Sequence, residues 1–202
     1  SNLNINHSTI TNNASVPPTW YGPAIYINAD VNDSESIIFN NVTISDNFEV
    51  IKFQSDADAE NTLIINSIVW NYIDILDFGG TIVYSNVQGD TTWSGEGNIN
   101  SDPMFINEES QDYNLESISP CINTGTPFYI WEIDTIVNVS PENYYGSSID
   151  MGSFEYICDS EIWDICDICE GDDSYCSGCT DPVAVNYNSN NTFDDGSCFY
   201  FI

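Results

Sequence analysis

Short runs of alternating apolar and polar residues recur through the first half of the chain at nearly constant spacing. One unit covers residues 25–40 and a second covers residues 51–66, so that each position matches the residue 26 places later. Runs rich in β-branched and aromatic residues between polar turns predict strands. A fixed period in this range predicts a solenoid in which each coil is buried by stacking on its neighbours. We therefore expect an all-β fold, a parallel β-helix.

Within these two units the alignment places Phe39 opposite Ile65. The pattern also extends beyond the two units on both sides. Residues 3–10 match the residues 34 places later, and residues 81–87 repeat the residues 18 places earlier. Asparagines recur at equivalent places, where stacked side chains can hydrogen-bond along the axis as a ladder: Asn6, Asn40 and Asn66.

The charge balance limits the classes of molecule that the chain can bind. The chain has 32 acidic residues against one basic residue, Lys52, which gives a formal net charge of −31. Nucleic acids and anionic membrane surfaces both need clustered Lys and Arg, so we exclude them as partners. Such a surface repels itself unless cations or salt neutralise it. Calcium is the natural candidate cofactor because it takes oxygen ligands. Adaptation to high salt is the alternative explanation, since it predicts the same acidic surface.

The cysteines indicate the compartment. Six of the seven lie after residue 157, and dense cysteine in a short acidic region predicts disulfides and an oxidising, extracellular setting. No apolar run approaches the length of a membrane span, and no signal peptide is visible. The chain starts in mid-pattern, so we expect a processed product or a piece of a longer protein.

Stacked acidic turns form the first candidate metal site. In the alignment, Asp30 and Asn32 fall on Asp56 and Asp58, with Glu60 close by. Adjacent coils lie about 4.8 Å apart, and carboxylates directly opposite each other repel unless something sits between them. A calcium ion would resolve that repulsion. The alternative is a solvated turn with screened charges.

A second oxygen-rich candidate lies near the end of the chain. Asp181, Asp194 and Asp195 fall between two cysteines. A calcium ion there would order a small module.

The sequence offers few residues that could support catalysis. Lys52 is the only basic side chain that could abstract a proton, and it lies on an expected strand, where a lone lysine is usually solvated. Carboxylate pairs could serve a hydrolase, but acidic residues are so common here that pairs arise by chance. Three aromatic residues are candidates for binding a carbohydrate: Trp20, Tyr21 and Trp93.

Five motifs in residues 84–155 carry a resemblance. In chain order they are Tyr84-Ser85-Asn86-Val87-Gln88-Gly89, Asp102-Pro103-x-Phe105, Asp112-Tyr113-x-Leu115, Ser119-Pro120-Cys121-Ile122-x-x-Gly125 and Asp150-x-Gly152-x-x-Glu155. Together they are similar to the closing coils of secreted bacterial right-handed β-helix proteins of the pectate-lyase-like superfamily. The resemblance covers about residues 1–157 and implies that Cys121 is a buried thiol in the solenoid. The family's catalytic motifs are not in this stretch.

Residues 158–202 resemble a different kind of segment. Residues 166–176 look like the Cys-rich linkers of secreted bacterial surface proteins, and residues 178–200 are similar to a short GCTDP…DDGSC repeat of the same proteins. The resemblance implies one disulfide in this repeat, and we expect two more before it. The alternative is zinc, because two Cys-x-x-Cys ends occur, although their separation is shorter than the usual spacer. The expected pairs are Cys179–Cys198, Cys169–Cys176 and Cys158–Cys166.

We therefore expect two domains, a right-handed parallel β-helix over residues 1–157 and an acidic Cys-rich module over residues 158–202. The expected function is that of a non-catalytic extracellular structural or adhesive surface protein, stabilised by calcium. An open coil end predicts head-to-tail assembly of copies into a filament. The alternatives are a fragment of a secreted polysaccharide lyase or hydrolase, and a carbohydrate-binding module with extracellular glycans as partners.

Overall fold

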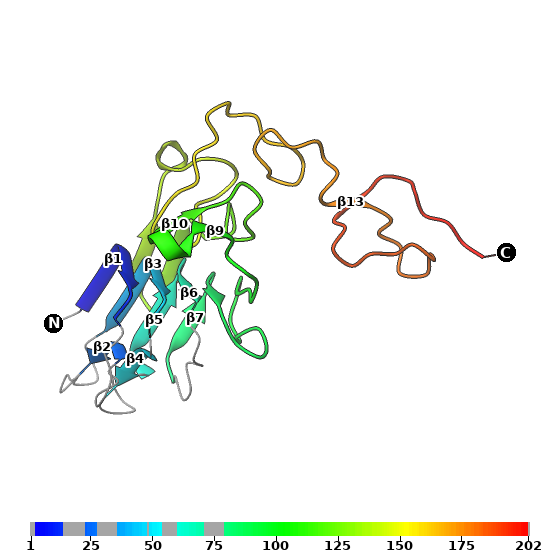
Figure 1. Ribbon diagram of the computed structural model, residues 1–202. Helices are drawn as coiled ribbons and strands as arrows, with labels where there is room; N and C mark the ends of the chain where they lie inside the picture. Colours follow the sequence, from blue (N-terminus) through cyan, green and yellow to red (C-terminus); the bar gives the residue numbers. More distant parts are fainter. Residues whose placement is uncertain are drawn as a thin grey trace. The chain divides into compact units, whose positions relative to one another are not determined.

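The computed structural model describes residues 3–13, 23–27, 36–47, 49–53, 60–70 and 79–201. The chain divides into two compact units, Ser1–Tyr156 and Ile157–Ile202. Most regular elements are strands, and the first unit is built on one curled parallel sheet of order β7-β5-β3-β6-β8, with β1 also pairing β3 (Figure 1). These strands are β1 (Leu3–Thr11), β3 (Ile37–Ser45), β5 (Thr62–Ile65), β6 (Ile68–Trp70), β7 (Thr81–Val83) and β8 (Asn86–Val87).

The sheet curls because its longest strands bend at one residue. β3 pairs with β5 before Asn41 and with β6 after it. Asn41 has a φ of 52°, in the left-handed region that asparagine tolerates better than most residues. The corresponding corners of the other coils have the same conformation, at His7, Asn66 and Tyr84. One left-handed residue per coil thus turns the sheet from one face to the next.

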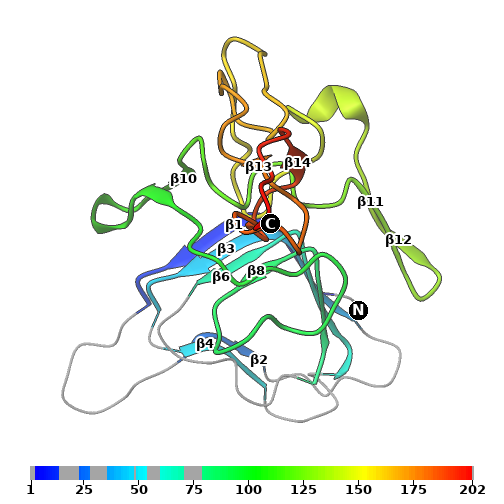
Figure 2. The ribbon, with the colours of Figure 1, turned by 90° about the vertical axis from the view of Figure 1, so that its right-hand side faces the viewer.

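The main core lies inside this bend. Phe39, Ile44 and Ile64 are fully buried there. A second parallel pair, β2 (Pro23–Ile27) and β4 (Glu49–Phe53), runs apart from the main sheet (Figure 2). Ile25 of β2 packs against the same core, so the β2–β4 pair and the main sheet share one apolar interior.

The register of the coils differs from the expectation at one step. The 34-residue and 18-residue shifts are confirmed, as is the 26-residue shift between β2 and β4. Between β3 and β5, however, Phe39 pairs with Ile64, a shift of one residue from the expected partner Ile65. Ile64 therefore faces the main core, while Leu63 and Ile65 belong to a second cluster on the outside of the sheet.

The later part of the first unit folds back over the outside of these coils. It contains β9 (Phe105–Asn107), β10 (Asp112–Leu115), the hairpin β11 (Phe128–Trp131) and β12 (Asp134–Asn138), and the short 3-10 turns η1 (Glu108–Ser110) and η2 (Pro141–Asn143). Tyr129 and Val137 of the hairpin pack on Leu63 and Ile65. This outer cover explains why β5 is buried on both faces.

The second unit is held by three disulfides and one short parallel pair, β13 (Ser177–Gly178) and β14 (Phe193–Asp194). The Cys179–Cys198 bond is present as expected. The other two expected pairs are wrong, because Cys158 is bonded to Cys169 and Cys166 to Cys176. All six cysteines of this unit are thus in disulfides, which leaves no thiolate there to bind zinc.

The turn around Asp164 explains the different pairing. Its carboxylate accepts hydrogen bonds from the N–H groups of Cys166 and Ile168. This tight turn brings Cys169 back to pair antiparallel with Trp163. Cys169 is thereby carried towards the start of the unit and away from Cys176.

Cleavage before aspartate distinguishes the two pairings. On the denatured, unreduced chain such cleavage separates Cys166, in residues 164–166, from Cys169, in residues 167–171. We expect residues 164–166 to remain linked to residues 173–180, because that fragment carries Cys176. Mass spectrometry before and after reduction measures the linkage. A link between residues 167–171 and 173–180 would contradict this pairing.

Candidate functional site

The first expected calcium site falls largely outside the described residues. Asp30, Asn32, Asp56 and Asp58 are not among them. Glu60 is described and is exposed. Within the described ranges no group of three or more His, Cys, Asp and Glu side chains could hold a metal ion.

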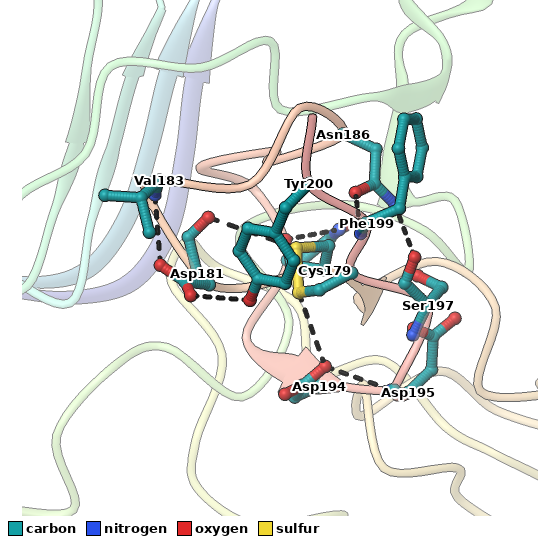
Figure 3. The surroundings of a disulfide bond; sticks show 12 residues. Cys179, Asp181, Val183, Asn186, Asp194, Asp195, Ser197, Phe199 and Tyr200 are labelled. Carbon is teal, nitrogen blue, oxygen red and sulfur yellow. Dashed lines mark hydrogen bonds between the residues drawn. A yellow bond between two sulfur atoms is a disulfide. The ribbon is translucent and has the colours of Figure 1, made fainter. Parts of the chain in front are cut away.

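The second expected site is an arrangement of hydrogen-bonded turns. Asp181 accepts bonds from the Val183 N–H and from the Tyr200 hydroxyl, at 3.0 and 2.7 Å. Asp194 and Asp195 each accept a bond from the N–H two residues later. Figure 3 shows the Asp181 carboxylate directed at Tyr200 and apart from the other two. Hydrogen bonds to these carboxylates lower the pKa of Asp181 and Asp195.

The expected binding and catalytic residues lie apart or outside the described part. Trp20 and Tyr21 are not described. Trp93 is half-buried and packs against the main core, so it forms part of the interior rather than an exposed platform. The backbone of Lys52 pairs with Tyr26, as the alignment predicts, but its side chain is outside the described set.

The structure assembles a different polar site, around residues 150–153, which we call the strap. The strap crosses successive coils of the parallel sheet on the outside. Gly152 N–H donates to the Asn66 carbonyl at 2.8 Å. Ser153 N–H donates to Thr43 Oγ1 at 3.0 Å, and the Ser153 hydroxyl lies 2.8 Å from that of Thr9. Three coils, those of Asn66, Thr43 and Thr9, are therefore tied together by one short segment.

The asparagines at the coil corners hold the chain that lies over them: Asn41 bonds to the strap, and Asn66 bonds to Thr126. Asn41 donates from its side-chain amide to the carbonyls of Asp150 and Gly152 at 3.0 and 3.3 Å. Asn66 is fully buried, accepts from the Thr126 N–H at 2.7 Å and donates to the Thr126 carbonyl at 3.1 Å. An amide both donates and accepts, so the Asn66 side chain satisfies the N–H and the C=O of one residue, Thr126, in the overlying chain.

Gly152 fits only without a side chain. Its φ is +97°, and a Cβ there would lie 2.8 Å from Ile68 Cδ1 and 2.9 Å from Thr43 Oγ1. The strap can approach the sheet this closely because glycine has no Cβ and adopts positive φ freely.

Two carboxylates anchor the strap at its ends. Asp150 is 1% exposed, and its side chain accepts bonds from the N–H groups of Asn123 and Tyr156. Glu155 in turn accepts a bond from the Asp150 N–H at 3.3 Å. Burial, together with the charge of Glu155, raises the pKa of Asp150 to about 8. Burial likewise raises the pKa of Glu155.

The surroundings of this pair offer no cation to balance it. The chain has one basic residue, Lys52. Two buried side-chain atoms among the described residues lack a hydrogen-bond partner, Asn123 Nδ2 and Glu155 Oε1. A buried carboxylate without a cation is stabilised by taking up a proton. Because Asp150 is closed off from solvent, it can hold a proton but cannot reach a polysaccharide.

Cys121 belongs to the same buried neighbourhood. It is a free, fully buried cysteine, as the resemblance implied. Asn86 donates from its side-chain amide to the sulfur at 3.1 Å, and the Met151 N–H donates to the Cys121 carbonyl at 2.9 Å. Burial raises the pKa of the thiol to about 12. The thiol is therefore an inert packing group beside the strap rather than a nucleophile.

Several residues in and around the strap were visible in the sequence only as members of motifs, without an assigned role. Gly125, Asp150, Gly152 and Glu155 all stand in the motifs that carry the family resemblance. Their chemical role could not be read from spacing, because their partners come from coils far away in the chain. The recurrence of Asn6, Asn40 and Asn66 in the sequence pointed to one corner residue, Asn66, but to Asn40 rather than the corner residue Asn41.

Comparison of the chain with protein-family models, with curated proteins and with solved structures gives no match. In the described part of the chain no helix is long and apolar enough to cross a membrane. The likeness to β-helix proteins therefore rests on the motifs and on the parallel sheet alone.

The Asp150 carboxyl makes the stability of the first unit pH-dependent. The pKa of Asp150 in the folded chain, about 8, lies above the ordinary aspartate value of 3.8, so its contribution to stability is complete below about pH 4 and is lost as the pH rises through 8. We expect the free energy of unfolding to fall by several kcal/mol across that interval, since each pKa unit is worth about 1.4 kcal/mol.

Urea unfolding of the wild type and of Asp150→Asn between pH 4 and 9 measures this effect. The variant should lose most of the slope, whereas Asp134→Asn, which changes an exposed carboxyl, should keep it. An unchanged slope in Asp150→Asn would refute the assignment.

Proposed function

We propose that the chain is a non-catalytic part of an extracellular structural or adhesive surface protein. In this proposal the first unit is a right-handed parallel β-helix, and the second is an appended module stapled by its disulfides. The parallel pairs on different sides of a shared core support the β-helix. The three disulfides support an oxidising, extracellular location.

One observation carries the proposal. Burial raises the pKa of two carboxyl groups, Asp150 and Glu155. The Asp150 carboxylate accepts hydrogen bonds from the backbone N–H groups of Asn123 and Tyr156, and Glu155 accepts one from the Asp150 N–H. Perturbed acids usually mark active sites, but a catalytic carboxyl must reach its substrate. Here the perturbed acids hold the architecture instead. This favours a scaffold over the polysaccharide-degrading enzyme that is the second candidate.

The proposal includes bound calcium, because the negative charge of the chain needs to be neutralised. A net charge of −31 on 202 residues repels itself. Ions bound between the turns of Asp30 and Asp56 would relieve that repulsion where coils stack. The acidic residues would then serve cohesion of the solenoid rather than chemistry.

A turnover assay tests the proposal against the enzyme. The purified chain is incubated with neutral and with uronate-containing polysaccharides, and reducing ends and unsaturated uronates are measured. We expect no product above that of the heat-denatured chain, because the only basic side chain is Lys52. Product formation that disappears in Lys52→Ala would establish the enzyme instead.

The same preparation tests the calcium component. Thermal unfolding is followed in calcium and in chelator at equal ionic strength, with magnesium as the control ion. We expect calcium to raise the melting temperature of the wild type and to have less effect on an Asp30→Asn, Asp56→Asn variant. Equal effects of calcium and magnesium on both proteins would indicate general screening.

A further inference from the structure

The β11–β12 hairpin, which lies outside the curled sheet (Figure 2), has one packed face and one exposed face. Tyr129 and Trp131 of β11 pack on the second cluster together with Val137 of β12. Side chains alternate between the two faces of a strand, so Phe128 and Ile130 lie on the opposite face. They are 55% and 51% exposed. The outer face of β11 is therefore apolar and open to solvent.

The turn of the same hairpin presents a third apolar side chain. Trp131 pairs with Asp134, so the turn consists of Glu132 and Ile133. Ile133 is 92% exposed. Turns of this length favour Asn-Gly, because they need positive φ, yet here Glu132 has a φ of 57°. A non-glycine residue in that conformation costs stability, and so exposed an isoleucine adds little to folding.

The three exposed apolar residues, which we call the hairpin patch, are Phe128, Ile130 and Ile133. Residues 79–201 are described without a gap around them. The second cluster beneath the hairpin takes its residues from β3, β5 and β7 as well as from the hairpin and its neighbours. The exposure of the patch is therefore a property of the hairpin and not of an end coil. Apolar side chains gathered in this way on a soluble surface are typical of an interaction site.

The charge beside the hairpin patch indicates what kind of partner fits. Glu132 and Asp134 flank Ile133 in the turn, and both are exposed. An apolar centre with an acidic rim complements an apolar surface that carries lysine or arginine. A second copy of the chain does not supply that complement, because it has one basic residue, Lys52, against 32 acidic residues. The complementary surface therefore belongs to a different, cationic protein.

We propose that the hairpin patch docks a cationic segment of another protein. Apolar side chains of that segment cover Phe128, Ile130 and Ile133, and its lysines or arginines pair with Glu132 and Asp134. Burial of the apolar surface supplies most of the affinity, and the charges select the partner and speed its association. This inference goes beyond the proposed function and holds for a scaffold and for an enzyme alike.

Isothermal titration calorimetry of the 202-residue chain with three short, end-blocked peptides tests the docking. One peptide alternates lysine with valine, another lysine with glycine, and the last glutamate with valine. At about 0.15 M salt, we expect the lysine–valine peptide to bind with a Kd of roughly 10–100 µM. It should bind about tenfold more tightly than either other peptide, because it alone combines apolar groups with positive charge.

Two substitutions with matched controls locate the contact. Ile133→Asn removes the most exposed apolar group, and Ile106→Asn changes a 53% exposed isoleucine of β9 as its control. Glu132→Gln removes one charge of the turn, and Glu161→Gln is its control, since Glu161 is also exposed and has a φ of 55°. Binding of the lysine–valine peptide should weaken about tenfold in Ile133→Asn and about threefold in Glu132→Gln. Both controls should bind like the wild type, and circular dichroism should be the same for all.

Several results would overturn the proposal. Absence of binding, or equal affinity of Ile133→Asn and the wild type, would exclude the hairpin patch as the docking site. Equal binding of the lysine–glycine and lysine–valine peptides would indicate general attraction to an acidic surface. Equal binding of the glutamate–valine peptide would show that charge does not select the partner. Self-association that Ile133→Asn abolishes, measured by sedimentation, would assign the patch to a second copy of the chain.

Discussion

The left-handed corner residue is the constraint on which the first unit depends. One residue per coil, at His7, Asn41, Asn66 and Tyr84, turns the parallel sheet through the same bend. Stacked bends keep the apolar side chains of successive coils inside a common core. At two of the corners the residue is asparagine, which tolerates this conformation and offers an amide that can bond to the chain lying outside the bend. Backbone geometry and polar recognition are thus combined in one side chain.

The strap is held by the Asn41 amide and joins coils that are distant in the sequence. Its backbone bonds reach the coils of Asn66 and Thr43, and Ser153 extends to Thr9. The burial needed for so close an approach leaves Asp150 inside without a cationic partner. The raised pKa of Asp150 is therefore a consequence of architecture, and its proton takes the place that a lysine or arginine would fill in a less acidic chain.

Much of the coil arrangement could be predicted from the apolar pattern, but one register could not. Leu63, Ile64 and Ile65 are all buried, because the hairpin β11–β12 covers the outer face of β5. A strand that is apolar on both faces carries no alternation to choose between two registers one residue apart. Two of the three predicted disulfide pairs were wrong for a similar reason. The turn at Asp164, and not the spacing of the cysteines, determines which cysteines pair. The strap was visible only as motif residues, since its partners lie in other coils.

Native-state hydrogen exchange tests most directly whether strap and coils form one cooperative structure. The amides of Gly152 and Ser153 bond to the coils of Asn66 and Thr43, so they should exchange with the same opening free energy as the amides of β3 and β5. Parallel loss of protection in both sets as denaturant is added would support this account. Fast exchange of the strap amides while β3 and β5 stay protected would contradict it, because the coils would then stand without the strap.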